Sequence, residues 1–164
     1  MYQNFNDVVF LKLNSLIFNL KEDDFSSVCK EKLLLPDKAY NFMKDVRKST
    51  LELLELYKNQ IFDFTKLNVF WYKYKSVAVY GFILALSINK DMKDYIIYVQ
   101  KHYFENYLGK IIDKPLLTGS EIMRLLNLEP SKKVGEIKEK LILAQLSGQI
   151  KTKDEAVNFI KSLE

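Results

Sequence analysis

The sequence predicts an all-α protein in which a multi-helix body is followed by a small three-helix C-terminal tail. Apolar residues recur at intervals of three and four along most of the chain, as they do on the buried face of a helix. Glycine is scarce, with five in 164 residues, and no pair of alternating apolar segments joined by a turn dipeptide occurs before residue 110. We expect the body over residues 1–113 and the tail over residues 114–164.

The first half of the body reads as three helices. Residues 7–20 carry apolar side chains close to helical spacing, and the acidic run at residues 22–24 supplies a polar break and a new N-cap. A second helix is expected over about residues 24–33. Pro36 suits the first turn of a third helix, and apolar spacing continues this helix to about Lys58.

The longest apolar run, residues 76–88, predicts a buried helix. It holds about a dozen residues, whereas a helix that spans a bilayer needs roughly 20. The start of the chain is polar, and Lys12 and Asn14 interrupt the apolar stripe that follows, so no secretory signal is recognised. We therefore expect a cytoplasmic protein with no membrane partner.

The composition is that of a globular protein, with 48% hydrophobic and 28% charged residues. The net charge of +4 permits a polyanionic partner without requiring one, because the excess is modest and spread along the chain. The single cysteine, Cys29, excludes an internal disulfide and a multi-cysteine zinc site. The single histidine, His102, excludes a histidine-rich metal centre, and no Gly-rich phosphate loop occurs.

Aromatic residues are dense between residues 62 and 107. In residues 70–75, FWYKYK, aromatic side chains alternate with Lys73 and Lys75, a pattern that can stack on bases while neutralising phosphates. Helical spacing favours core packing for most of these rings, and both interpretations remain open. A long helix is then expected from Asp91 to about Gly109, with residues 113–115 as a hinge into the tail.

The tail has explicit helix start and stop signals. Thr118 followed three residues later by Glu121 is a capping box, which predicts the start of the first tail helix. This helix should end near Leu128, because the residue before Pro130 is disfavoured in a helix. Ser131 is a suitable N-cap for a second helix, which we expect to end at Gly148. Thr152 and Glu155 repeat the capping-box spacing and start a third helix through Lys161.

The middle tail helix has the residues of an anion-binding site. Lys132 and Lys133 fall in its first turn, where unpaired amides and the positive end of the helix dipole already favour a phosphate. Gly135, one turn into the helix, leaves room for another backbone to approach. Solvated lysines beside a packing glycine account for the same spacing, so the two interpretations stay open.

Ordered positions over about 45 tail residues resemble the C-terminal end of bacterial class II tRNA nucleotidyltransferases, the CCA-adding enzymes, and poly(A) polymerases. The matching positions are Leu117 to Met123, Leu128, Pro130, Val134 to Glu136, Ala144, Gln145, Gly148 to Ile150, Thr152, Lys153, Glu155 and Ala156. Asn127-Leu128 and Ser131-Lys132 stand where the family usually has a glycine and Gly-Pro. The first 110 residues are similar, more weakly, to the region that precedes this tail in the family.

The resemblance implies a protein that holds tRNA by its elbow, through phosphate and backbone contacts, while a catalytic head acts on the 3′ end. The paired aspartates of the family's head and the nucleotide-reading motif of its neck have no counterpart in this sequence. Magnesium and the nucleoside triphosphate would therefore belong to a head domain in the same parent protein or in another chain, and we expect no cofactor and no catalytic or metal-ligating residue here. The expected RNA-binding residues are Thr118, Gly119, Lys132, Lys133 and Gly135, supported by Lys138, Lys151 and Lys153.

A protein-interaction module is the alternative. It would dock on a separate catalytic subunit or on a second copy through the aromatic segment, without binding RNA. Formation of a dimer that hides the fluorescence of Trp71 would favour it. An enzyme in its own right is the least favoured hypothesis, because no nucleophile and base, and no acidic metal pair in a suitable setting, can be assembled from the sequence.

Overall fold

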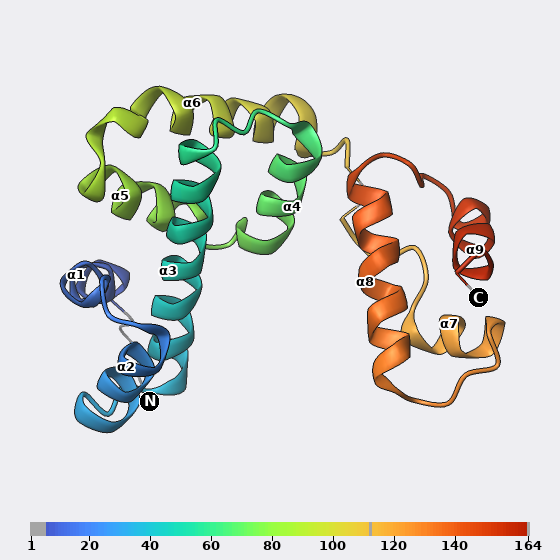
Figure 1. Cartoon of the computed structure of the whole chain (residues 1–164), viewed down its shortest axis with the longest axis horizontal. Helices are drawn as coiled ribbons and strands as arrows, with labels where there is room; N and C mark the ends of the chain where they lie inside the picture. The colour runs from blue at the N-terminus through green and yellow to red at the C-terminus, as the bar shows by residue number, and fades with distance from the viewer. Residues whose placement is uncertain (1–5, 112, 164) are drawn as a thin grey trace. The chain divides into compact units, whose positions relative to one another are not determined.

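The computed structural model describes residues 6–111 and 113–163, and all regular elements within them are helices (Figure 1). The predicted all-α class is confirmed. The α-helices are α1 (Asp7–Ile17), α2 (Glu22–Ser27), α3 (Asp37–Lys58), α4 (Phe64–Tyr74), α5 (Ala78–Ile88), α6 (Lys93–His102), α7 (Gly119–Leu125), α8 (Lys132–Leu146) and α9 (Lys153–Lys161). A π-helical turn follows α2 at Val28–Lys32 and another follows α6 at Tyr103–Tyr107.

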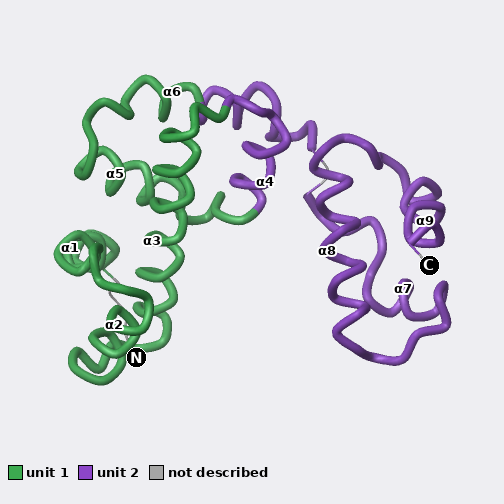
Figure 2. The backbone as a smooth tube through the Cα atoms, in the orientation of Figure 1, with its two compact units in different colours: residues 1–61, 73–98 green, residues 62–72, 99–164 purple. Residues whose placement is uncertain are grey.

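The chain forms two compact units (Figure 2). Unit 1 comprises residues 1–61 and 73–98, and unit 2 comprises residues 62–72 and 99–164. The chain passes between them before α4, within α4 and within α6. The domain boundary at residue 113 stays a prediction. Of the described helices, none combines the length and apolar character needed to cross a bilayer.

The acidic run after α1 lies inside a helix. The sequence predicted that it would break the chain and cap a helix starting at Asp24, but α2 begins at Glu22 with Lys21 as its N-cap. Three carboxylates therefore occupy the first turn of α2, where the positive end of the helix dipole favours them. That expectation was wrong because acidic residues serve equally well as caps and as first-turn residues.

A buried arginine fixes the turn between α1 and α2 onto α3 in unit 1. Arg47 of α3 has 7% of its surface exposed. Its Nε donates to the carbonyl oxygen of Phe18 at 3.2 Å, and its Nη1 pairs with Glu22 at 2.9 Å. Its Nη2 donates to the carbonyl oxygen of Leu20. One guanidinium thus satisfies two backbone carbonyls of the turn that follows α1.

Helix α5 packs on α3 through a close approach at Gly81. A Cβ atom at Gly81 would lie 2.5 Å from Ser49 Oγ, a distance that real Cβ contacts do not reach. The opposite face of α5 is exposed, with Val79 at 60% and Ile83 at 50%. The expected buried helix is therefore present, but its burial is confined to the side that carries Gly81, Phe82 and Ala85.

The aromatic segment of α4 divides between core and surface. Phe70 and Trp71 are buried in unit 2, and the Trp71 ring lies 4.4 Å, centroid to centroid, from that of Tyr103. Tyr72 is 37% exposed. Lys73 forms an ion pair with Glu52 at 3.2 Å in unit 1. Core packing accounts for the two most apolar rings, and Tyr72 is the ring of this stretch in unit 2 that faces outward.

The tail helices α7, α8 and α9 surround one apolar cluster in unit 2. The cluster consists of Leu117, Ile122, Leu126, Val134, Ile137, Leu141, Ala144, Ile150, Ala156 and Ile160. Both predicted capping boxes are present, at Thr118 for α7 and at Thr152 for α9. The sequence therefore predicted the start of each outer tail helix.

Two tail helices end earlier than expected, through left-handed residues. Asn127 has φ +49° after α7, and the amide of Leu128 donates to the carbonyl of Met123 at 2.9 Å. Gly148 has φ +78° after α8, and the amide of Gln149 donates to the carbonyl of Ala144 at 3.0 Å. Each is a Schellman ending, in which a left-handed residue redirects the chain. Asparagine adopts this conformation more readily than most residues, so Asn127 takes the role of a C-terminal glycine.

Candidate nucleic-acid interface

The start of α7 is fixed by its capping box. Thr118 Oγ1 accepts from the amide of Glu121 at 3.2 Å, and the amide of Thr118 donates to Glu121 Oε2 at 2.8 Å. The same carboxylate pairs with the ammonium group of Lys153 at the start of α9. These partners, the Lys153 ammonium foremost, lower the pKa of Glu121 to about 2. Thr118 and Lys153, both expected at an RNA contact, are thus engaged in joining the two helix starts.

Gly119 lies beside the first turn of α8. A Cβ atom on Gly119 would meet Val134 Cγ1 at 3.9 Å, an ordinary van der Waals distance. The starts of α7, α8 and α9 therefore gather at neighbouring positions of the tail, through this contact and the pair between Lys153 and Glu121. Lys151 precedes α9 with an exposed side chain, and its backbone amide donates to Glu155 at 2.7 Å.

The first turn of α8 presents two exposed lysines. Ser131 is the N-cap, as predicted, but its side chain makes no capping hydrogen bond within the described residues. Lys132 and Lys133 are the first two helical residues, and both are exposed. Lys132 Nζ lies 3.8 Å from Glu136 Oε1, and the Lys132 side chain is 94% exposed. A pair this exposed stabilises the helix by only about 0.3–0.5 kcal/mol, so it competes weakly with an external anion.

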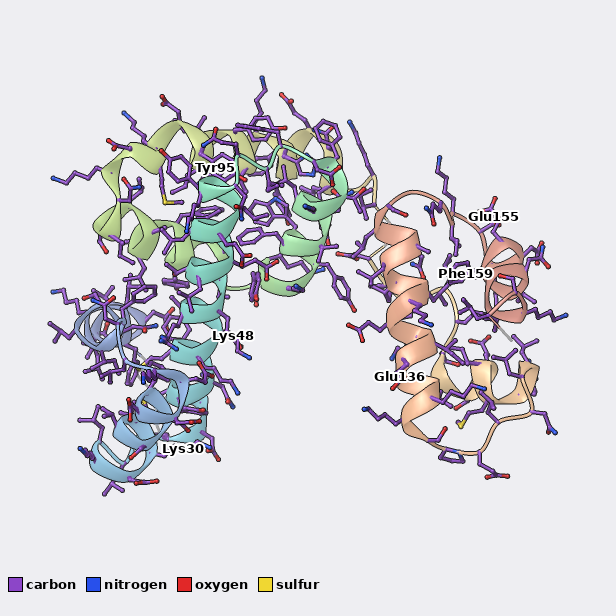
Figure 3. The ribbon with its side chains drawn as sticks, viewed as in Figure 1. Lys30, Lys48, Tyr95, Glu136, Glu155 and Phe159 are labelled. Carbon is purple, nitrogen blue, oxygen red and sulfur yellow. The ribbon has the colours of Figure 1, made fainter. Side chains whose placement is uncertain are left out.

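The expected contact residues of α8 do not all share one face. Lys132, Gly135 and Lys138 follow one another at intervals of three and form a stripe along the helix. Lys132 and Lys138 each lie about 60° from Gly135 around the helix axis, whereas Lys133 lies about 160° from it. Glu136 lies on the N-terminal half of α8, at its surface (Figure 3). In the part of the chain that the structure describes, the ammonium groups of Lys133 and Lys138 have no carboxylate partner.

The stripe borders a surface hollow that the sequence did not reveal. The hollow has a volume of about 220 Å³ and is lined by Tyr72 of α4 and by Gly135, Lys138, Glu139 and Ile142 of α8. Its α8 residues follow the helical spacing of three, four and seven, which is a recognisable signal for one face. The participation of Tyr72 has no such signal, because it stands 63 positions before Gly135 in the chain and only folding brings the two together.

Buried neutral side chains hold α4 and the C-terminal half of α8 in unit 2. Asn68 Nδ2 donates to the carbonyl oxygen of Leu146 at 2.9 Å, and Asn68 Oδ1 lies 2.8 Å from His102 Nε2. Because the Asn68 oxygen can only accept, His102 Nε2 carries the proton. Burial lowers the pKa of His102, because the charged ring would lose its hydration there.

A second buried amide ties down the entry to the tail. Gln145 Nε2 donates to the carbonyl oxygen of Lys114 at 3.0 Å, and Gln145 Oε1 accepts from the amide of Leu116 at 3.2 Å. The sequence predicted a hinge at residues 113–115, but this segment is hydrogen-bonded to α8 on both sides of Pro115. Local turn chemistry indicated the bend correctly, whereas the tertiary anchor could not be inferred from it.

The remaining chemistry of the site is simple. Within residues 6–111 and 113–163, no three His, Cys, Asp or Glu side chains come together in a way that could hold a metal ion. The arrangement offers exposed cations, a bare helical glycine and one outward-facing aromatic ring.

No protein-family model matches the chain, and no curated protein or solved structure is significantly similar to it.

Proposed function

We propose that this chain is the tRNA-holding body and tail of a cytoplasmic nucleotidyltransferase of the CCA-adding or poly(A)-adding kind. The tail grips the tRNA elbow through its phosphate backbone, and a catalytic head outside these residues adds nucleotides with magnesium and nucleoside triphosphate. The observation that carries the proposal is the stripe of Lys132, Gly135 and Lys138 on α8, where two exposed cations flank a residue without a side chain.

This stripe suits recognition of a folded RNA by shape and charge. Backbone recognition needs positioned cations and close approach, with little reading of base edges. Lys132 and Lys138 supply the cations, and no described atom outside α8's own backbone and the neighbouring residues lies within 4 Å of a Cβ placed on Gly135. A phosphate can therefore come close to α8 between the two ammonium groups. The capping boxes at Thr118 and Thr152 support the site by fixing the helices around α8.

A binding titration tests the proposal. The purified chain is titrated with full tRNA, a minihelix that lacks the elbow, and an unrelated duplex RNA, each at two salt concentrations. We expect tighter binding to full tRNA, weakening as salt rises because cations on the protein displace counterions from the RNA. Equal or negligible binding to all three RNAs would contradict the proposal.

Charge substitutions on α8 locate the contact. Replacing Lys132 and Lys138 together by alanine should reduce the log–log salt slope by up to about two, one for each phosphate released. Lys133→Ala tests whether the adjacent side of the first turn also contacts RNA. Lys161→Ala, an exposed lysine in the last turn of α9, is the matched control and should leave the slope unchanged. An unchanged slope in the double variant would remove the stripe from the interface.

A protein-interaction role is the second candidate, and exposed apolar side chains of unit 1 favour it. Leu16 is 82% exposed, and Val79 and Ile83 protrude from the outer face of α5. A dimer or a complex through this surface should dissociate when Ile83 is replaced by lysine, as measured by size-exclusion chromatography with light scattering. Trp71 cannot report this association by its fluorescence, because it is only 5% exposed within unit 2.

A further inference from the structure

We propose that the hollow between α4 and α8 binds one unpaired nucleotide of an RNA, with its base stacked on Tyr72 and its phosphate at Lys138. The inference deepens the proposed function and rests on it, because it names what part of an RNA this face of the tail receives. The inference predicts that this face of the tail recognises an extruded base in addition to phosphates.

Tyr72 provides the stacking platform. It is 37% exposed and lines the hollow, whereas its neighbours Phe70 and Trp71 are buried. The Asn68 side chain of α4 donates to the carbonyl oxygen of Leu146 at the end of α8, so the ring is presented from a fixed helix. An aromatic ring on a rigid element stacks on any base, because every base has a π face.

Gly135 supplies the space. It lies within α8 and its φ is not left-handed, so the backbone does not require glycine there. Apart from its chain neighbours and the backbone of α8 itself, no described atom lies within 4 Å of a Cβ built on it, so internal packing does not require glycine either. Glycine inside a helix is nonetheless less stable than alanine. The position therefore lacks an internal reason for glycine, and an external group that needs the open surface provides one.

The charges around the hollow orient a nucleotide. Lys138 has no carboxylate partner within the described residues, and Lys132 lies one turn before Gly135 on the same stripe. Glu139 also lines the hollow and repels a phosphate from its side. The phosphate accordingly lies toward Lys138, and Glu139 accepts a hydrogen bond from an N–H group on the edge of the base.

The size of the hollow limits the ligand. Its volume of about 220 Å³ is below the usual range of about 300–1,000 Å³ for pockets that enclose a drug-sized molecule. A hollow of this volume suits a single planar base better than a dinucleotide or a cluster of peptide side chains. Ile142, which is 5% exposed, forms an apolar part of the wall against which the flat base can lie.

The test compares two single-stranded RNA probes on the full chain. One is an octamer of adenosine, and the other is an octamer with the same number of phosphates whose nucleotides are abasic. Tighter binding of the base-bearing octamer is expected. Tyr72→Ala should weaken that octamer by about 5- to 150-fold, the loss corresponding to one stacked base, and leave the abasic octamer unaffected. Tyr72→Phe keeps the ring and should retain binding.

Gly135→Ala gives a second variant whose effect cannot be attributed to misfolding. It should raise the thermal midpoint of the chain, because alanine favours the helix, while it weakens the adenosine octamer by partly filling the hollow. The Gly135 amide resonance, one of five from glycine in the chain, should shift when the octamer binds. Unchanged octamer affinity in both Tyr72→Ala and Gly135→Ala would overturn the proposal.

The outcomes separate this inference from the proposed function. Suppose that the chain prefers full tRNA but that Tyr72→Ala does not change its affinity for the octamer. This result would refute the base site and leave the tRNA-holding role intact. Tyr72-dependent octamer binding without any preference for full tRNA would support the base site and refute the elbow-gripping role. Equal affinity for the base-bearing and abasic octamers would show a phosphate contact alone and overturn the base site.

Discussion

Two helical glycines, Gly81 in unit 1 and Gly135 in unit 2, have opposite surroundings. Gly81 allows α5 to touch α3, because a Cβ there would lie 2.5 Å from Ser49 Oγ. Gly135 faces open space on α8. The same residue type therefore serves internal packing in one unit and leaves a surface uncovered in the other. The difference teaches that the role of a glycine within a helix depends on which atoms lie opposite it.

The two units also bury different kinds of polar group. In unit 1 the guanidinium of Arg47 donates to the carbonyls of Phe18 and Leu20 in the turn after α1. In unit 2 the neutral side chains of Asn68, His102 and Gln145 connect α8 to α4 and to the tail entry. An uncharged residue of the same size in place of Arg47 leaves its carbonyl partners without a donor. The neutral network of unit 2 depends instead on whether His102 is protonated.

Removal of the buried cation should have the largest effect on stability. Arg47→Met preserves much of the side-chain volume but leaves the carbonyls of Phe18 and Leu20 without their donor. Unsatisfied buried groups cost about 1–3 kcal/mol each, so we expect the free energy of unfolding to fall by about 2–4 kcal/mol. Urea denaturation followed by circular dichroism measures this. Glu22→Gln is the control and should cost much less, because the Glu22 side chain is 55% exposed.

Substitution at the close helix contact should have the next largest effect. Gly81→Ala places a Cβ against Ser49 and should lower the free energy of unfolding by about 1–3 kcal/mol through overpacking. Combining it with Ser49→Ala removes the nearest atom and should recover part of the loss, in a double-mutant cycle measured by urea denaturation. Additive effects of the two substitutions would contradict the contact.

Gly135→Ala should change stability in the opposite direction. Because the added methyl group meets no other atom, the helix propensity of alanine should raise the free energy of unfolding by about 0.5–1 kcal/mol. The measurement is the same urea titration, with Gly81→Ala as the paired variant. A loss of stability at Gly135 would show that the two glycines do not differ in the way described.

The stability of unit 2 should decrease gradually as the pH is lowered and His102 becomes protonated. Burial lowers the pKa of His102 below its ordinary 6.5, so the unfolded chain binds the proton more readily than the folded chain. Stability is therefore complete above about pH 6.5 and falls as the pH is lowered below it. Thermal midpoints at pH 7.5 and 5.5 should show this fall. The fall should shrink in His102→Gln, and an identical pH response would exclude His102 as its source.

Local chemistry made much of the tail predictable. The capping boxes at Thr118 and Thr152 act within four residues, so their spacing alone located two helix starts. The end of α7 was less predictable because Asn127 adopts a left-handed conformation that the sequence does not demand. In the candidate site, Lys132, Gly135 and Lys138 were recognised individually, while the hollow that Gly135 and Lys138 form with Tyr72 was not.

By itself, the sequence determined the helical class, the order of the tail helices and the charges available on α8. Each of these depends on residues a few positions apart, whose spacing carries the physical cause. The tertiary structure alone decided that Arg47 is buried, that Gly81 is a contact while Gly135 is not, and that Tyr72 faces α8. These properties depend on which distant atoms fill or leave empty the space beside a residue, and that is fixed only when the helices pack.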